Sequence, residues 1–107
     1  MNYQTISPVE LREKIESGGK FRLIDVREPV EFEIAGIEGA ELLPMSRANE
    51  WLADLNPSEE LVFFCHHGIR SGNICAFLAQ NGFEKLYNLA GGIDSLSEEV
   101  DNNVPRY

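Results

Sequence analysis

The sequence predicts an α/β fold in which helices cover both faces of a parallel β-sheet. Short apolar segments, typical of buried strands, alternate along the chain with segments of helical periodicity. Hydrophobic residues make up 43% of the chain and charged residues 25%, a composition typical of globular proteins. Because 107 residues suit one compact domain, we expect a single domain over residues 1–107.

The first predicted helix begins at Pro8. Ser7 is a favourable N-cap, Pro8 fits the first helical position, and Glu10 completes a capping box with Ser7. The glycine pair at 18–19 ends this helix. The short apolar segment 21–26 that follows has the composition of a buried strand.

Three further elements are predicted in the middle of the chain. Residues 40–43 form a weaker strand candidate, and residues 49–55 a short helix with Trp51 on its apolar side. Residues 61–64 form the strongest strand candidate, because all four are apolar.

The last third of the chain continues the alternation. A helix is predicted over 71–81, and Gly82 stands where a glycine after a helix end belongs. A strand over 85–89, a turn over 90–92 and a helix over 93–100 follow. In such sheets, ligands bind beyond the carboxyl ends of the strands.

Cys65 stands at such an end, directly after the strongest strand candidate and before a short loop into a helix. The N–H groups at a helix N-terminus are unsatisfied and its dipole is positive, so a loop curled around Cys65 would bind an anion. Gly68 permits the tight backbone curve, and Arg70 adds a positive charge suited to an oxyanion. We expect a reactive thiolate at Cys65 that also stabilises a persulfide.

Structural roles are the alternative for the same residues. Cys65 would otherwise be a small buried hydrophobe, and packing is the expected role of Cys75. His66 and His67 would either donate hydrogen bonds to a bound anion, act as acid–base groups or face solvent. No metal site is expected, since consecutive residues rarely all point at one ion.

The charge balance limits the classes of partner. Nine Lys and Arg against eighteen Asp and Glu give a formal charge of −9, which argues against a nucleic-acid surface. No apolar run approaches the ~20 residues of a membrane span. The first residues lack the basic start and apolar core of a signal peptide, so we expect a cytoplasmic protein.

Three groups of motifs follow one another along the chain. They are LIDVREPVEF at 23–32 with IEGA at 37–40 and LP at 43–44, then CHHGIRS at 65–71, then LAGGID at 89–94 with VPRY at 104–107. In this order they resemble the rhodanese family of sulfurtransferases. The resemblance implies a rhodanese-like three-layer fold, with about five mostly parallel strands and helices on both faces.

The resemblance also implies a reaction. The active cysteine, here Cys65, takes a sulfane sulfur from thiosulfate or a persulfide donor, and cyanide or a thiol then removes that sulfur. The resemblance implies a binding loop whose backbone amides come from His66, His67, Gly68, Ile69, Arg70 and Ser71. It also implies that the Arg70 side chain contacts the anionic donor. The resemblance implies no cofactor, and the acidic surface would attract a sulfur-carrier protein with a basic patch.

Two residues at the end of the strand candidate over 21–26 are expected to support this site. Asp25 would either contact Arg70 and order the loop, or form an Asx-type cap on the next segment. Arg27 is expected to form an ion pair with Glu31 that fixes the segment after the strand.

Two other function classes were considered. One is a non-catalytic binding or regulatory module, although such modules usually lose the cysteine, which is present here. The other is a cysteine phosphatase or arsenate reductase. Phosphatases place five residues between cysteine and arginine, whereas Cys65 to Arg70 inclusive is six residues, so the cup is one residue shorter and better suits a single sulfur.

Overall fold

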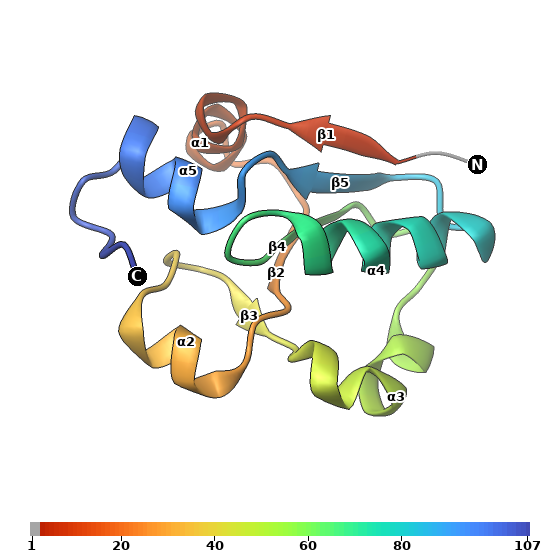
Figure 1. The fold of residues 1–107 in the computed structure, drawn as a ribbon. Helices are drawn as coiled ribbons and strands as arrows, with labels where there is room; N and C mark the ends of the chain where they lie inside the picture. The colour runs from red at the N-terminus through yellow and green to blue at the C-terminus, as the bar shows by residue number, and fades with distance from the viewer. Residues whose placement is uncertain (1–2) are drawn as a thin grey trace.

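The computed structural model describes residues 3–107 and contains one β-sheet whose strands all pair in parallel (Figure 1). The strand order is β1-β5-β4-β2-β3. The strands are β1 (Gln4–Ile6), β2 (Arg22–Asp25), β3 (Glu41–Leu42), β4 (Leu61–Phe64) and β5 (Leu86–Leu89). The predicted parallel sheet is confirmed, and it has five strands.

The helices connect these strands and pack on both sides of the sheet (Figure 1). The α-helices are α1 (Pro8–Glu16), α2 (Pro29–Ile34), α3 (Ala48–Trp51), α4 (Ile69–Gln80) and α5 (Gly92–Glu99). Two 3₁₀ turns, Met45–Arg47 and Leu52–Asp54, flank α3, so the predicted helix over 49–55 is a mixed 3₁₀ and α segment.

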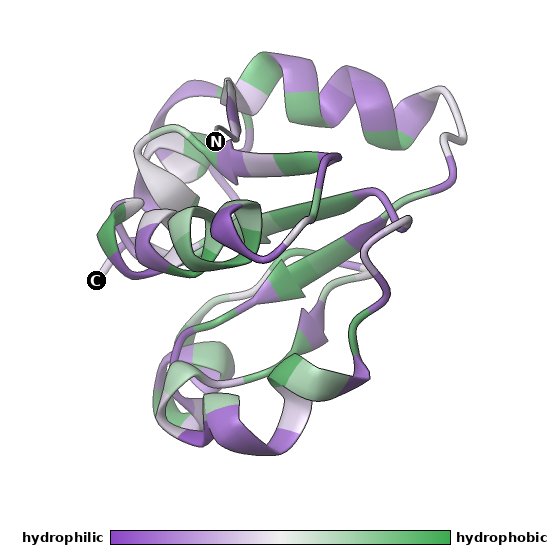
Figure 2. Ribbon diagram, turned by 90° about the vertical axis from the view of Figure 1, so that its right-hand side faces the viewer, coloured by the Kyte–Doolittle hydropathy of each residue, from purple (hydrophilic) through white to green (hydrophobic). Residues whose placement is uncertain are grey.

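Successive residues of the central strands enter two separate hydrophobic cores. Ile24 and Phe63 pack with residues of α3 and α4 on one face. Leu23 and Phe64 pack with residues of α1 and α5 on the other. Figure 2 shows hydrophobic colouring along the central strands between helices of mixed character. Because both faces are covered, these strands are apolar throughout rather than alternating.

The first helix begins and ends as predicted. The Ser7 hydroxyl accepts from the Glu10 N–H at 3.1 Å, and the Glu10 carboxylate accepts from the Ser7 N–H at 2.9 Å. Ser17 is the C-cap, and Gly18 follows in the left-handed region at φ +73°. This reciprocal cap satisfies two N–H groups that a helix N-terminus otherwise leaves unpaired.

Two elements were not predicted, β1 and α2. The sequence did carry an N-terminal signal for α2, because Pro29 occupies the first helical position and Glu31 completes a capping box with Glu28. However, α2 buries none of its residues, and Val30 on it is 63% exposed. A six-residue helix without an apolar stripe has no periodicity to detect.

The parallel arrangement brings the carboxyl ends of β2, β4 and β5 to the same edge of the sheet. The register pairs Asp25 with Phe64, the last residues of β2 and β4. The candidate site lies at this edge, on the ends of these strands and on the segments that leave them. Within residues 3–107, no helix has the length and apolar character that crossing a membrane requires.

Candidate active site

Cys65 directly follows β4, and its sulfur lies inside the loop that leads into α4. The residue is only 1% exposed. The backbone N–H groups of Gly68 and Ser71 point at the sulfur, with N to Sγ distances of 3.1 and 3.4 Å. The Ser71 hydroxyl oxygen lies 3.3 Å from the same atom. The loop therefore directs two of the six expected amides and one hydroxyl at Sγ.

The curl of this loop depends on Gly68, which is the N-cap of α4. Its φ of +102° lies in the left-handed region, where a side chain would be strained. The helix starts at Ile69, two residues earlier than predicted, because Gly68 already turns the chain. Ile69 itself is 75% exposed, so the loop meets solvent at this side chain.

The N-terminus of α5 packs against the back of the loop. The N–H groups of Ile93 and Asp94 donate to the carbonyl oxygens of Cys65 and His66, at 2.9 and 3.1 Å. A Cβ at Gly92 would lie 2.4 Å from each of these two oxygens. The carbonyls of Cys65 and His66 accept from α5 and not from N–H groups of the loop itself. The N–H groups of Gly68 and Ser71 can therefore point at the sulfur.

Asn88, in β5, ties the loop to the sheet. Its side-chain oxygen accepts from the Ser71 hydroxyl at 2.5 Å, and its amide nitrogen donates to the Gly68 carbonyl at 3.0 Å. The Ser71 hydroxyl has a single proton, so it donates either to Asn88 or to the Cys65 sulfur at any moment. Sequence reasoning missed Asn88, although a polar residue between Tyr87 and Leu89 in a strand candidate was a signal.

Asp25 and Arg27 form a fully buried ion pair beside the sheet edge. Arg27 donates to Asp25 through Nε at 2.9 Å and through Nη2 at 2.7 Å. The Asp25 carboxylate also accepts from the Arg27 N–H at 3.0 Å, which confirms the predicted Asx-type cap rather than a contact with Arg70. Burial opposes the charged form of Arg27, but hydrogen bonds to Asp25 and Tyr107 outweigh it and raise its pKa.

The predicted ion pair between Arg27 and Glu31 is wrong. The Arg27 guanidinium is buried against Asp25 and the Ala35 carbonyl, and it reaches only the backbone oxygen of Glu31. The Glu31 carboxylate instead binds Arg70, with distances of 2.7 and 2.9 Å. Hydrogen bonds from Arg70 outweigh burial and lower the pKa of Glu31 to about 2, and the same pair raises the pKa of Arg70.

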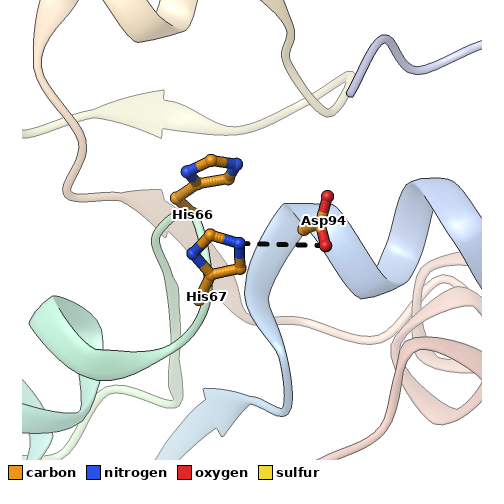
Figure 3. Close-up of side chains that lie close together, drawn as sticks. All are labelled: His66, His67 and Asp94. Atoms are coloured by element: carbon orange, nitrogen blue, oxygen red, sulfur yellow. Dashed lines mark ion pairs between the residues drawn. The ribbon is translucent and has the colours of Figure 1, made fainter. Parts of the chain in front are cut away.

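His66 and His67 stack on one another, and Tyr107 stacks on His66. The ring centroid of His66 lies 3.9 Å from that of His67 and 3.9 Å from that of Tyr107. Burial, followed by the proximity of His67, lowers the pKa of His66 and favours its neutral form. His67 is solvent-exposed, and its Nε2 faces Asp94 at 3.8 Å (Figure 3).

The donor atoms of His66, His67 and Asp94 lie within 4.8 Å of one another, so this group was considered as a metal site. The two rings are only 29° from parallel, so their in-plane lone pairs run side by side rather than converge on one ion. Both Asp94 oxygens also accept from Arg106, at 2.9 and 3.1 Å. We therefore assign no ion to this cluster.

Cys75 has the packing role predicted for it. It lies in the core on α4, and its thiol is 3.6 Å from the Tyr87 carbonyl. Burial, with a smaller contribution from Cys65, raises the pKa of Cys75 to about 12. Its sulfur is therefore protonated at neutral pH and is a poor nucleophile.

The geometry as a whole suits covalent chemistry on an anionic sulfur. N–H groups at the start of α4 and the Ser71 hydroxyl converge on one atom, Sγ of Cys65. Such donors stabilise a thiolate at Sγ. Glu31, Asn88 and Tyr107 complete the surroundings of the loop, and none of them was predicted as a site residue.

Comparison with known proteins gives related sequences of three kinds. The chain is 40% identical over 105 residues to the probable adenylyltransferase/sulfurtransferase MoeZ of Mycobacterium tuberculosis, covering 96% of this chain but only 27% of that protein. It is 39% identical to YtwF of Bacillus subtilis, covering 87% of this chain and 89% of YtwF. It is 29% identical to thiosulfate sulfurtransferase GlpE of Pseudomonas aeruginosa, covering 86% and 82%.

Solved structures share this fold, and the sequence matches the model of a protein family. A rhodanese-like domain protein from Staphylococcus aureus superposes with a TM-score of 0.81 at 26% identity, covering 97% of this chain and 98% of that one. The model of the rhodanese-like domain matches residues 7–99. The all-parallel order β1-β5-β4-β2-β3 is that of the rhodanese fold. The chain thus belongs to the rhodanese-like domain family.

Proposed function

We propose that this protein is a sulfurtransferase that carries a sulfane sulfur on Cys65. In the first step the Cys65 thiolate attacks the sulfane sulfur of the donor. A new S–S bond forms at Sγ while the donor's own S–S bond breaks, and the leaving group departs with the electron pair. Thiosulfate would release sulfite, and a persulfide would release a thiolate.

The second step returns the enzyme to its starting form. An acceptor such as cyanide or a thiolate attacks the outer sulfur of the Cys65 persulfide. Cyanide forms thiocyanate, and the electron pair of the broken S–S bond stays on the Cys65 sulfur as a thiolate. No net oxidation or reduction occurs over the cycle, and the protein itself carries the sulfur between donor and acceptor.

One observation carries the proposal, namely the convergence of the Gly68 and Ser71 N–H groups and the Ser71 hydroxyl on Sγ of Cys65. These donors would stabilise the negative charge of the thiolate before reaction, and N–H groups of the same loop would surround the outer sulfur of the persulfide after it. Homologues named as sulfurtransferases support the same reaction class. We propose the backbone N–H groups of His66, His67, Ile69 and Arg70 as the remainder of the cradle.

The experiment that tests this proposal is intact-mass analysis after treatment with thiosulfate or a small persulfide. We expect a gain of one sulfur, about 32 Da, that cyanide removes. Cys65→Ser should abolish the adduct, while Cys75→Ser, a matched control at the buried packing cysteine, should retain it. An unmodified mass with every donor would favour the alternative of a non-catalytic binding module.

A further inference from the structure

The one arginine of the candidate loop, Arg70, forms an ion pair with Glu31. Arg70 donates from Nη1 to Oε1 of Glu31 at 2.7 Å and from Nη2 to Oε2 at 2.9 Å. This bidentate geometry uses the same fork of donors that an arginine would offer to an oxyanion. A free anionic substrate therefore meets a guanidinium whose charge is already matched and whose Nη1 and Nη2 fork is occupied.

Glu31 is held in this position by other contacts. The Tyr107 hydroxyl donates to Oε2 at 2.9 Å, and the N–H of Glu28 donates to Oε1 at 3.0 Å as part of the α2 capping box. Swinging the carboxylate away from Arg70 would break these bonds as well. The pair is thus a built feature of the junction between α2 and α4.

The other arginines of the described structure near the loop are matched in the same way. Arg27 is buried against Asp25, and Arg106 binds Asp94 and Glu98. His66 favours its neutral form. The formal charge of the whole chain is −9, so its long-range field repels a dianion. At the loop, Arg70, Arg27 and Arg106 each already have an acidic partner.

We infer that Glu31 is a specificity-determining residue, which neutralises Arg70 and thereby selects persulfide donors over the thiosulfate dianion. This inference rests on the proposed sulfur transfer at Cys65 and names its donor class. A persulfide delivers its sulfur without a sulfonate group and has no need of a free guanidinium. The backbone N–H groups of the loop bind the transferred sulfur in either case.

The test compares kcat/KM for thiosulfate with that for a small persulfide that has an uncharged substituent. Glu31→Gln keeps the shape of the side chain and removes its charge. We expect the ratio of thiosulfate to persulfide kcat/KM to rise roughly tenfold, mostly through a lower KM for thiosulfate. Arg70→Gln combined with Glu31→Gln should abolish this gain, because the released guanidinium is its source.

Glu33→Gln is the matched control, since Glu33 is exposed on the same helix and its substitution removes the same unit charge. This variant should leave the donor ratio within about twofold, because a distant exposed charge is screened. If Glu33→Gln raised the ratio as much as Glu31→Gln, the effect would come from the general field, and the inference would be wrong.

A binding measurement keeps the test independent of turnover. In a Cys65→Ser background, calorimetry should show tighter thiosulfate binding when Glu31→Gln is added. Glu31→Ala gives a second variant with no side chain to bond Arg70. Equal losses for both donors in both variants would make Glu31 a purely structural residue and overturn the inference. No turnover of either donor by the unaltered protein would instead overturn the proposed sulfurtransferase function.

Discussion

At the scale of single residues, the buried pair of Asp25 and Arg27 is the contact whose removal is expected to lower the stability of the fold most. Both side chains are fully buried, and Arg27 also donates to the Ala35 carbonyl at 2.6 Å and to the Tyr107 hydroxyl at 2.9 Å. Removing one partner of such a pair leaves an uncompensated charge away from water. The pair therefore fixes the path of the chain from β2 into α2.

We predict that Arg27→Met destabilises the protein by about 3–5 kcal/mol, measured by urea unfolding, because the buried Asp25 carboxyl group would lose its ion-pair partner. Arg12→Met is the matched control, since Arg12 pairs with Glu16 at 3.2 Å on an exposed helix face. Such exposed pairs contribute about 1 kcal/mol or less. Equal losses in the two variants would show that burial of the pair has no energetic consequence.

The choice of ion-pair partners could not be predicted from the sequence. Arg27 and Glu31 are four residues apart, which favours a local pair, whereas Arg70 is 39 positions from Glu31. The decision between them depends on where α2 and α4 meet in space. Only the fold provides that information, because it buries Arg27 against Asp25 and leaves the Glu31 carboxylate facing Arg70.

At the scale of elements, α5 supports the loop from behind. The N–H groups of Ile93 and Asp94 donate to the carbonyls of Cys65 and His66, and Gly92 leaves no room for a Cβ beside these two oxygens. Gly92 has φ +62°, in the left-handed region. A helix far along the chain therefore sets the orientation of the peptide groups around the sulfur.

We predict that Gly92→Ala lowers both stability and sulfur transfer. The new Cβ would lie 2.4 Å from two backbone oxygens, so the loop or α5 must shift and the amides would leave the sulfur. We expect at least a tenfold loss in the rate of Cys65 persulfide formation, measured by intact mass over time, with a lower thermal midpoint.

Gly82→Ala separates backbone strain from the steric clash at Gly92. Gly82 has φ +89°, and a Cβ there would meet nothing within 4 Å. This variant should cost about 1–2 kcal/mol of stability from strain alone and leave persulfide formation unchanged. If Gly92→Ala behaved in the same way, the contact between α5 and the loop would have no role in the reaction.

The sequence predicted long elements with apolar faces better than short exposed ones. The strand over Leu61–Phe64 was predicted with its bounds, and the helix ending before Gly82 within two residues, since apolar runs and glycine ends leave a clear pattern. Neither β1 nor α2 leaves such a pattern. The curled loop was predicted from Cys65 and Gly68, but its supports from Asn88 and α5 depend on long-range packing.

At the scale of the whole molecule, carboxylates dominate the response to acid. Hydrogen bonds from arginines lower the pKa of Glu31, Glu41 and Asp94, with Arg70, Arg22 and Arg106 as the respective donors. A group whose folded pKa is below its unfolded value stabilises the fold above the unfolded pKa. That stabilisation is lost as the pH falls toward the folded pKa. The protein should therefore become less stable in acid, although its net negative charge also decreases there.

We predict that Glu31 accounts for a measurable part of this acid sensitivity. Its folded pKa of about 2 lies below the ordinary pKa of a glutamate, so its contribution is complete above about pH 5 and lost toward pH 2. After allowance for solvent screening, we expect Glu31→Gln to lower the free energy of unfolding by about 1–2 kcal/mol at pH 6, and by nearly nothing at pH 2. Arg70→Gln should remove the same pH-dependent part in urea unfolding. A difference between the unaltered protein and Glu31→Gln that stayed constant from pH 6 to pH 2 would contradict the ion pair as its origin.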